Sequence, residues 1–191
     1  YDPGANFPGD LSIYRDLRYG KNLHLVLTDA RTYRSDHPVA EDAFPGHVPV
    51  VQSELEAYLG ELPEWASPYV DDIDAYQNGD YATALRDAAD ELGYDAEQIV
   101  GRMSVDWINA RLEEIDGATA PIDDTTLERG IAYVDLNKYG HFSSIGSRSL
   151  VVKPAFDAYA GIEFEASGGA SEQVWGEAQE NWVFDRLENS D

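Results

Sequence analysis

The residues of this chain best suited to chemistry follow one short apolar run. In the segment NLHLVLTDARTYR that run ends at Asp29, and Arg31, Tyr33 and Arg34 follow within five residues. An arginine presents a rigid fork of N–H donors that can hold a phosphate or carboxylate group with two hydrogen bonds. Two arginines so close together predict an anion-binding loop, in which Asp29 and Tyr33 could orient the loop or approach a metal ion. The same pattern fits a purely structural role, in which Asp29 pairs with one arginine to fix the loop.

A β-hairpin is the element expected to position this loop. Residues 11–19 alternate apolar side chains on one parity, a turn follows at Gly20-Lys21-Asn22, and residues 23–28 form the returning strand. Because the returning strand is apolar on both faces, it is predicted to lie buried in the centre of a sheet. In α/β proteins, working residues follow the C-terminal end of such a strand.

The rest of the chain predicts a helical block, then extended segments and a final helix. Apolar residues at three- and four-residue spacings indicate helices over 51–62, 80–92, 95–115 and 171–190. Enrichment in Val, Ile, Tyr and Phe predicts extended segments over 131–140 and 149–165. Asp80 is the expected N-cap of the second helix and Gly93 its stop. This order of elements indicates an α/β or α+β fold.

Composition sets the class of the protein and excludes several partners. Of the 191 residues, 43% are hydrophobic, which suffices for a packed core. The 37 Asp and Glu against 13 Lys and Arg give a formal charge of −24, which repels nucleic acid and anionic membranes and attracts cations. Acid-rich, lysine-poor surfaces suit high salt, so a marine or halophilic source is an expectation. No apolar run approaches ~18 residues, so no membrane span is predicted, and the lack of cysteine excludes thiolate chemistry.

Several familiar site patterns fail in this chain. The acidic stretch 71–80 places tyrosine and leucine at ligand positions of an EF-hand loop, so a solvated turn is expected there. The histidines lack the spacing of metal ligands, although His37 and His47 share a loop with Glu41 and Asp42 and could form a weak cation site. Neither a Walker phosphate loop nor a serine-hydrolase elbow is present.

Two stretches together resemble the alkaline phosphatase D (PhoD-like) phosphodiesterases. The first reads IYRDLRYG, then LHLVLTDARTYR, and is similar to the family's Y-R-x-x-x-[FY]-G followed by L-D-T-R-x-[YF]-R. Its matching residues are Tyr14, Arg15, Tyr19, Gly20, Asp29, Arg31, Tyr33 and Arg34, whereas Thr28 and Ala30 depart. The second, WGEAQENWVFDRL, resembles L-G-x-x-Q-x-x-W-L-x-x-x-L. Its matching residues are Gly176, Gln179, Trp182 and Leu187, whereas Trp175 and Val183 depart.

The resemblance implies a periplasmic or extracellular metallophosphoesterase whose core is a sandwich of two mixed sheets flanked by helices. It implies metal-assisted hydrolysis of a phosphoester substrate, with iron and calcium as cofactors. The family's aspartate, asparagine and histidine metal motifs are missing from this sequence. The chain is therefore expected to be an incomplete piece of the sandwich, inactive alone, whose partner is the remainder of the parent enzyme and whose Arg31–Arg34 loop borders the active site.

Three segments follow from this interpretation. Residues 1–48 would be the strand hairpin and arginine loop of the core, 49–116 a helical insertion or cap, and 117–191 extended segments with a C-terminal core helix. The alternative is a stand-alone acidic module that binds cations or a protein through the helical block. An enzyme segment should expose an apolar sheet edge or face where the missing part docks, whereas a module should close its own core. A complete small hydrolase is a third interpretation, which the lack of a nucleophile or metal set disfavours.

Overall fold

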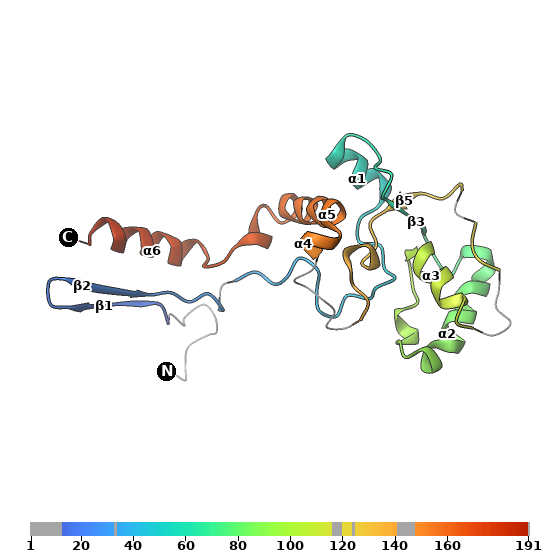
Figure 1. Cartoon of the computed structure of the whole chain (residues 1–191), viewed down its shortest axis with the longest axis horizontal. Helices are drawn as coiled ribbons and strands as arrows, with labels where there is room; N and C mark the ends of the chain where they lie inside the picture. Colours follow the sequence, from blue (N-terminus) through green and yellow to red (C-terminus); the bar gives the residue numbers. More distant parts are fainter. Residues whose placement is uncertain (1–12, 33, 116–119, 124, 141–147, 191) are drawn as a thin grey trace. The chain divides into compact units, whose positions relative to one another are not determined.

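The computed structural model describes residues 13–32, 34–115, 120–123, 125–140 and 148–190 (Figure 1). The chain forms two compact units. Unit 1 consists of residues 1–37 and 164–191, and unit 2 consists of residues 38–163. The described residues combine helices with two small antiparallel sheets, one in each unit, as in an α+β protein.

The predicted hairpin is confirmed in unit 1. Strands β1 (Arg15–Tyr19) and β2 (Leu23–Leu27) pair antiparallel, with Leu17 opposite Leu25. Gly20 has φ of 61° in the connecting turn, a left-handed conformation that glycine adopts without a Cβ clash. The turn therefore fixes the pairing register, and with it which side chains lie on each face of the hairpin.

The prediction that the returning strand is buried and central is wrong within the described residues. Among the described residues, strand β2 pairs only with β1, and one face of the hairpin is open: Leu17 is 40% exposed, Tyr19 58%, Leu23 57% and Leu25 44%. The strand is apolar on both faces, as a central strand is, but only one face is covered here.

The covered face of the hairpin packs against helix α6 (Glu177–Glu188). The helix predicted over 171–190 is confirmed for this part, but its first turn is a separate 3₁₀ turn (Ala170–Glu172) and Gly176 takes φ of 73° before α6 starts. The rings of Tyr14 and Trp182 have centroids 4.9 Å apart. The Arg186 guanidinium lies 3.6 Å from the carboxylate of Asp16. The helix therefore holds the hairpin through an aromatic contact, Tyr14 with Trp182, and an ion pair, Arg186 with Asp16.

Unit 2 is built on a three-stranded sheet. Its middle strand β3 (Ser67–Val70) pairs antiparallel with β4 (Met103–Ser104) on one side and β5 (Arg129–Gly130) on the other. A Cβ at Gly130 would collide with the backbone of Val50, which explains the glycine there. The helices that accompany the sheet are α1 (Gln52–Leu59), α2 (Asp80–Leu92), α3 (Val105–Leu112), α4 (Arg148–Val151) and α5 (Lys153–Ala166), the last of which ends in unit 1. Short 3₁₀ turns cover Tyr76–Gly79, Ala96–Gln98, Val134–Leu136 and Ala170–Glu172.

Unit 2 closes its own hydrophobic core in two main clusters. One joins α2 and α3 around residues that include Leu85, Met103 and Ile108, each with no exposed surface. The other joins α1 and α5 to the sheet around Leu55 and Ile131. No helix among the described residues is both long and apolar enough to cross a membrane.

Three expectations about the helices need correction. The single helix predicted over 95–115 is broken: a 3₁₀ turn ends near Ile99, Gly101 takes φ of 64°, and α3 starts only after its N-cap Ser104. Helix α2 starts at Asp80 with Gly79 as the N-cap, whereas its predicted stop at Gly93 is confirmed. The segment 149–165 is not extended, because Ala155, Ala158 and Tyr159 recur at helical spacing and bury one face of α5.

The segment 131–140 is likewise mostly not extended. Strand β5 ends at Gly130, and Ile131 forms an isolated antiparallel bridge with Val50 instead of pairing with β3. A 3₁₀ turn then places Asp135 against β3. Its carboxylate accepts hydrogen bonds from the Ser67 hydroxyl and the Ala132 backbone N–H, both at 2.8 Å. Burial raises the pKa of Asp135 to about 6, because the apolar surroundings disfavour the charged form.

The wild type should lose stability as the pH rises through the pKa of Asp135, and Asp135→Asn should not. The pKa of Asp135 is about 6 when folded, against 3.8 for an unperturbed group, so the native state holds a proton that the unfolded chain gives up. Its stabilising effect is therefore present at low pH and is lost between about pH 4 and pH 6, by roughly 1–3 kcal/mol. The asparagine amide can accept from Ala132 and donate to Ser67, so the variant should be more stable than the wild type at pH 7.

Urea unfolding followed by circular dichroism at pH 4, 5, 6 and 7 measures this difference. Asp87→Asn, on the exposed face of α2, is the matched control and should leave the pH profile unchanged. A wild type and an Asp135→Asn variant with parallel pH profiles would contradict the assignment.

Candidate functional site

Asp29 organises the arginine loop through the backbone. Its side chain is buried, with 3% of its surface exposed, and Oδ1 accepts hydrogen bonds from the N–H groups of Arg31 at 3.0 Å and Thr32 at 2.9 Å. Hydrogen bonds from the side chain and backbone of Thr32 are the main cause that lowers the pKa of Asp29. The carboxylate therefore stays ionised at neutral pH and holds the start of the loop in a tight turn.

Gln179 of α6 holds the backbone of Asp29 from the other side. The Asp29 N–H donates to Gln179 Oε1 at 2.5 Å, and Gln179 Nε2 donates to the Asp29 carbonyl at 2.8 Å. Gln179 is 1% exposed, and its amide also donates to the Trp175 carbonyl at 3.0 Å. This pair of reciprocal bonds satisfies the polar groups of a buried amide and a buried backbone at once.

The far end of the loop has a second anchor. The Ser35 N–H donates to the Gln173 carbonyl at 2.9 Å, and the Ser35 hydroxyl donates to the Ser171 carbonyl at 2.6 Å. Both anchors come from the chain around α6, so the loop is held at its two ends within unit 1.

The arginine side chains lie between these anchors and point to solvent. Arg31 and Arg34 are exposed, and among the described residues neither guanidinium makes a hydrogen bond or ion pair. With Ala30, Ser35 and Asp36 they line a surface pocket with a volume of about 670 Å³. The alternative in which Asp29 pairs with an arginine is not what forms here, because Asp29 bonds to backbone N–H groups instead. Tyr33 lies outside the described residues.

This arrangement can bind an anion but supplies no complete catalytic set. Two forked cations oppose one carboxylate, Asp36, whose Oδ1 accepts the His37 N–H at 2.8 Å. The local charge is positive in a chain of −24, so an oxyanion would be attracted to this pocket. Among the residues that line it, none is placed as a nucleophile with a neighbouring general base.

The described residues do not fit a resident metal ion on their own. Asp29 Oδ2 is buried and has no hydrogen-bond partner among them, so it is a candidate ligand at the start of the loop. In the described part of the chain, three or more histidine, aspartate or glutamate side chains nowhere gather to hold a metal ion. Iron or calcium needs more ligands than one carboxylate oxygen, so the described residues alone would not hold either ion.

Sequence reasoning identified the loop but missed how it is held. In the sequence, Gln179 is marked only by its place in the C-terminal motif, and no pattern marks Ser35. The available signal was spacing. Gln179 lies four residues after Trp175 and three and four residues before Trp182 and Val183, so a polar group falls on the apolar face of the helix. No family model, curated protein or solved structure matches this chain.

Gln179→Ala should loosen the arginine loop without unfolding unit 2. The substitution leaves the Asp29 N–H and carbonyl buried without partners, at a cost of about 2–4 kcal/mol in the stability of unit 1. Hydrogen exchange of the Asp29, Arg31 and Thr32 amides, followed by NMR, should accelerate at least about tenfold. Asn181→Ala, an exposed change on the same helix, is the control. Unchanged exchange at these three amides in Gln179→Ala would show that the amide does not hold the loop.

Proposed function

We propose that this chain is a segment of a metal-dependent phosphoesterase of the alkaline phosphatase D type, in which the Arg31–Arg34 loop holds the phosphoryl group of the substrate. The proposal rests on these motifs and on the two guanidinium groups of Arg31 and Arg34, which line one surface pocket and make no hydrogen bond or ion pair with the described residues. Metal ions, iron and calcium by resemblance, would be held by residues of the parent enzyme outside this segment.

One observation carries the proposal: the two motif stretches, far apart in the sequence, contact each other. Asp29 of the first bonds reciprocally to Gln179 of the second, at 2.5 and 2.8 Å. The ring of Tyr14 of the first contacts the ring of Trp182 of the second, with centroids 4.9 Å apart and planes tilted by 53°. Four of the residues that carry the resemblance thus link the two stretches in pairs, Asp29 with Gln179 and Tyr14 with Trp182.

The glycines of the motifs support the same interpretation. Gly20 turns the hairpin with φ of 61°, and Gly176 precedes α6 with φ of 73°. Both backbone conformations strain any residue with a Cβ. A motif that specifies glycine at these two places describes this hairpin and this helix start.

The open face of the hairpin favours an enzyme segment over a stand-alone module. Leu17, Tyr19, Leu23 and Leu25 form a continuous apolar face on a two-stranded sheet, which has marginal stability by itself. Further strands or helices of the parent enzyme would cover that face and complete the proposed two-sheet sandwich. Such an enzyme would act in the periplasm or outside the cell.

The stand-alone acidic module is the second candidate. Unit 2 favours it, because this unit buries two clusters of apolar residues without help from unit 1. The two candidates differ in what the natural full-length polypeptide contains and in what happens to the hairpin face within it.

Replacing the loop arginines should impair catalysis while leaving the fold intact. In the natural full-length polypeptide, Arg31→Ala and Arg34→Ala should each lower kcat/KM for bis(p-nitrophenyl) phosphate about 10- to 100-fold, because each removes charge-assisted hydrogen bonds to the phosphoryl group. Arg31→Lys and Arg34→Lys should recover only part of the loss, because lysine lacks the fork. Lys21→Ala, an exposed cation in the hairpin turn, is the matched control. Arginine variants within twofold of the wild type would refute the role of the loop.

The hairpin face should be solvent-exposed in this chain and covered in the natural full-length polypeptide. Hydroxyl-radical footprinting reports this at Tyr19, which is 58% exposed here and should be oxidised at least about fivefold more slowly in the full-length protein. Tyr139, 70% exposed in unit 2, is the internal reference. Equal oxidation of Tyr19 in both, or a natural product no longer than this chain, would favour the acidic module.

A further inference from the structure

The open face of the hairpin carries one cation among its paired residues. Alternate side chains of a strand lie on the same face, so Arg15 of β1 shares the open face with Leu17 and Tyr19. Leu27 is its direct partner across the two strands, so its neighbours on the sheet are apolar. Arg15 is exposed, and within the described part of the chain its guanidinium makes no hydrogen bond or ion pair.

The covered face of the same hairpin shows how a charge is matched when a helix lies over it. Asp16 Oδ2 lies 2.8 Å from Nε2 of His24, and Asp16 Oδ1 lies 3.6 Å from Nε of Arg186 on α6. The hydrogen bond with His24 is the main cause that lowers the pKa of Asp16, and the charge of Arg186 lowers it further. The helix that covers this face therefore brings a countercharge to it, whereas Arg15 on the open face has none among the described residues.

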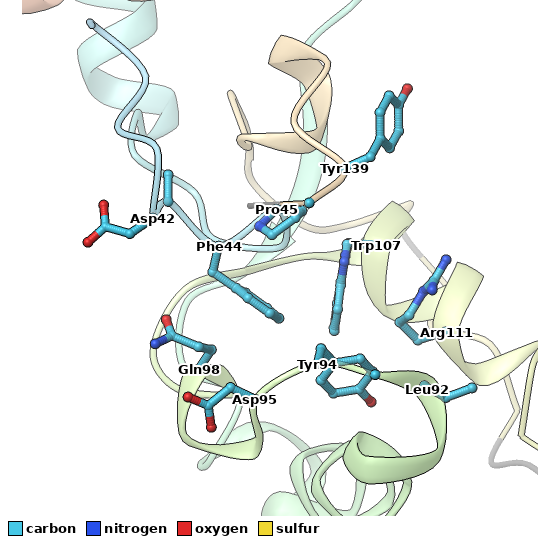
Figure 2. Close-up of a pocket in the computed structure, with 13 residues that line it drawn as sticks. Asp42, Phe44, Pro45, Leu92, Tyr94, Asp95, Gln98, Trp107, Arg111 and Tyr139 are labelled. Atoms are coloured by element: carbon cyan, nitrogen blue, oxygen red, sulfur yellow. The ribbon is translucent and has the colours of Figure 1, made fainter. Parts of the chain in front are cut away.

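The aromatic side chains of unit 2 provide a second contrast, because they cover one another. The ring centroids of Phe44 and Trp107 are 4.9 Å apart at 62°, and those of Tyr94 and Trp107 are 5.3 Å apart at 72° (Figure 2). These rings pack edge to face at one cluster of the core. The open face of the hairpin has no such cover, so anything that buries it comes from outside the described residues.

Covering the open face without a partner for Arg15 would be unfavourable. An element that buries Leu17 and Leu25 would also remove water from the guanidinium beside them. Arginine stays protonated in proteins, so the side chain cannot escape this desolvation by losing a proton. Buried charges are therefore paired, and a carboxylate matches a guanidinium with two parallel hydrogen bonds.

We propose that the segment covering the open face is amphipathic and acidic, with apolar side chains against Leu17 and Leu25 and a carboxylate paired with Arg15. The inference rests on the proposed function, because it takes this segment to belong to the parent enzyme. A second copy of this chain fits the face less well. The same face of a copy has no carboxylate among its paired residues, and two chains of −24 repel each other.

A zero-length cross-link tests for the carboxylate directly. In the natural full-length polypeptide, Arg15→Lys keeps the positive charge and introduces an amine that a water-soluble carbodiimide joins to a contacting carboxylate. Peptide mass spectrometry should find the introduced lysine joined to an Asp or Glu outside these 191 residues, at least about fivefold more often than Lys21 of the hairpin turn. A cross-link to a carboxylate within residues 1–191, in the same copy or a second one, would contradict the proposal.

Thermal unfolding tests the same pair without a cross-linker. Arg15→Met should lower the Tm of the full-length polypeptide by at least about 4 °C, because it leaves a buried carboxylate without its partner. The same change should shift the Tm of this chain alone by less than about 1 °C, because an exposed, unpaired arginine contributes little. Lys21→Met, at an exposed cation of the turn, is the matched control in both proteins. No excess cross-link together with an unchanged Tm would overturn the proposal.

The oxidation of Tyr19 separates this inference from the proposed function. If Tyr19 is protected in the full-length polypeptide but neither the cross-link nor the loss of stability is found, the face is covered without a carboxylate and this inference alone fails. If Tyr19 is oxidised equally in both proteins, the cover itself is missing and the enzyme-segment interpretation fails with it.

Discussion

The reciprocal hydrogen bonds between Asp29 and Gln179 are the interaction on which unit 1 depends. A buried backbone N–H and carbonyl and a buried side-chain amide satisfy each other at 2.5 and 2.8 Å, so neither partner can move alone without leaving polar groups unpaired. The link fixes the end of β2 against α6, and from that fixed point the loop departs. The aromatic contact of Tyr14 with Trp182 then places the rest of the hairpin on the same helix.

The loop divides structural and ligand-facing roles between neighbouring residues. The Asp29 carboxylate accepts hydrogen bonds from the backbone N–H groups of Arg31 and Thr32. The guanidinium groups of Arg31 and Arg34 therefore have no partner among the described residues. Had Asp29 paired with an arginine, the local positive charge would have been cancelled. In a chain of −24, two arginines that line one pocket without an ion pair among the described residues are the feature most difficult to attribute to structure alone.

Local signals predicted the elements that are defined by local sequence. The hairpin around Gly20, the stop of α2 at Gly93 and the C-terminal helix all follow from turn residues and apolar spacing. The break at Gly101 was hidden because apolar residues continue through it: Ile99 before the break and Met103 after it are both buried in the same cluster. The partner of Asp29 could not be predicted, because a bond between residues 150 positions apart leaves no local pattern.

The arrangement of the two units along the chain constrains the order in which they can form during synthesis. Unit 2 is one uninterrupted stretch, residues 38–163, whereas unit 1 needs both the first strands and the last helix. During synthesis, the face of the hairpin that α6 covers therefore stays exposed until α6 has left the ribosome, and unit 2 can fold in that interval. Once folded, unit 2 holds its first residue against α5, because the Tyr159 hydroxyl donates to the Pro38 carbonyl at 2.6 Å, so joining the two parts of unit 1 costs less loop-closure entropy than it would across an unfolded segment.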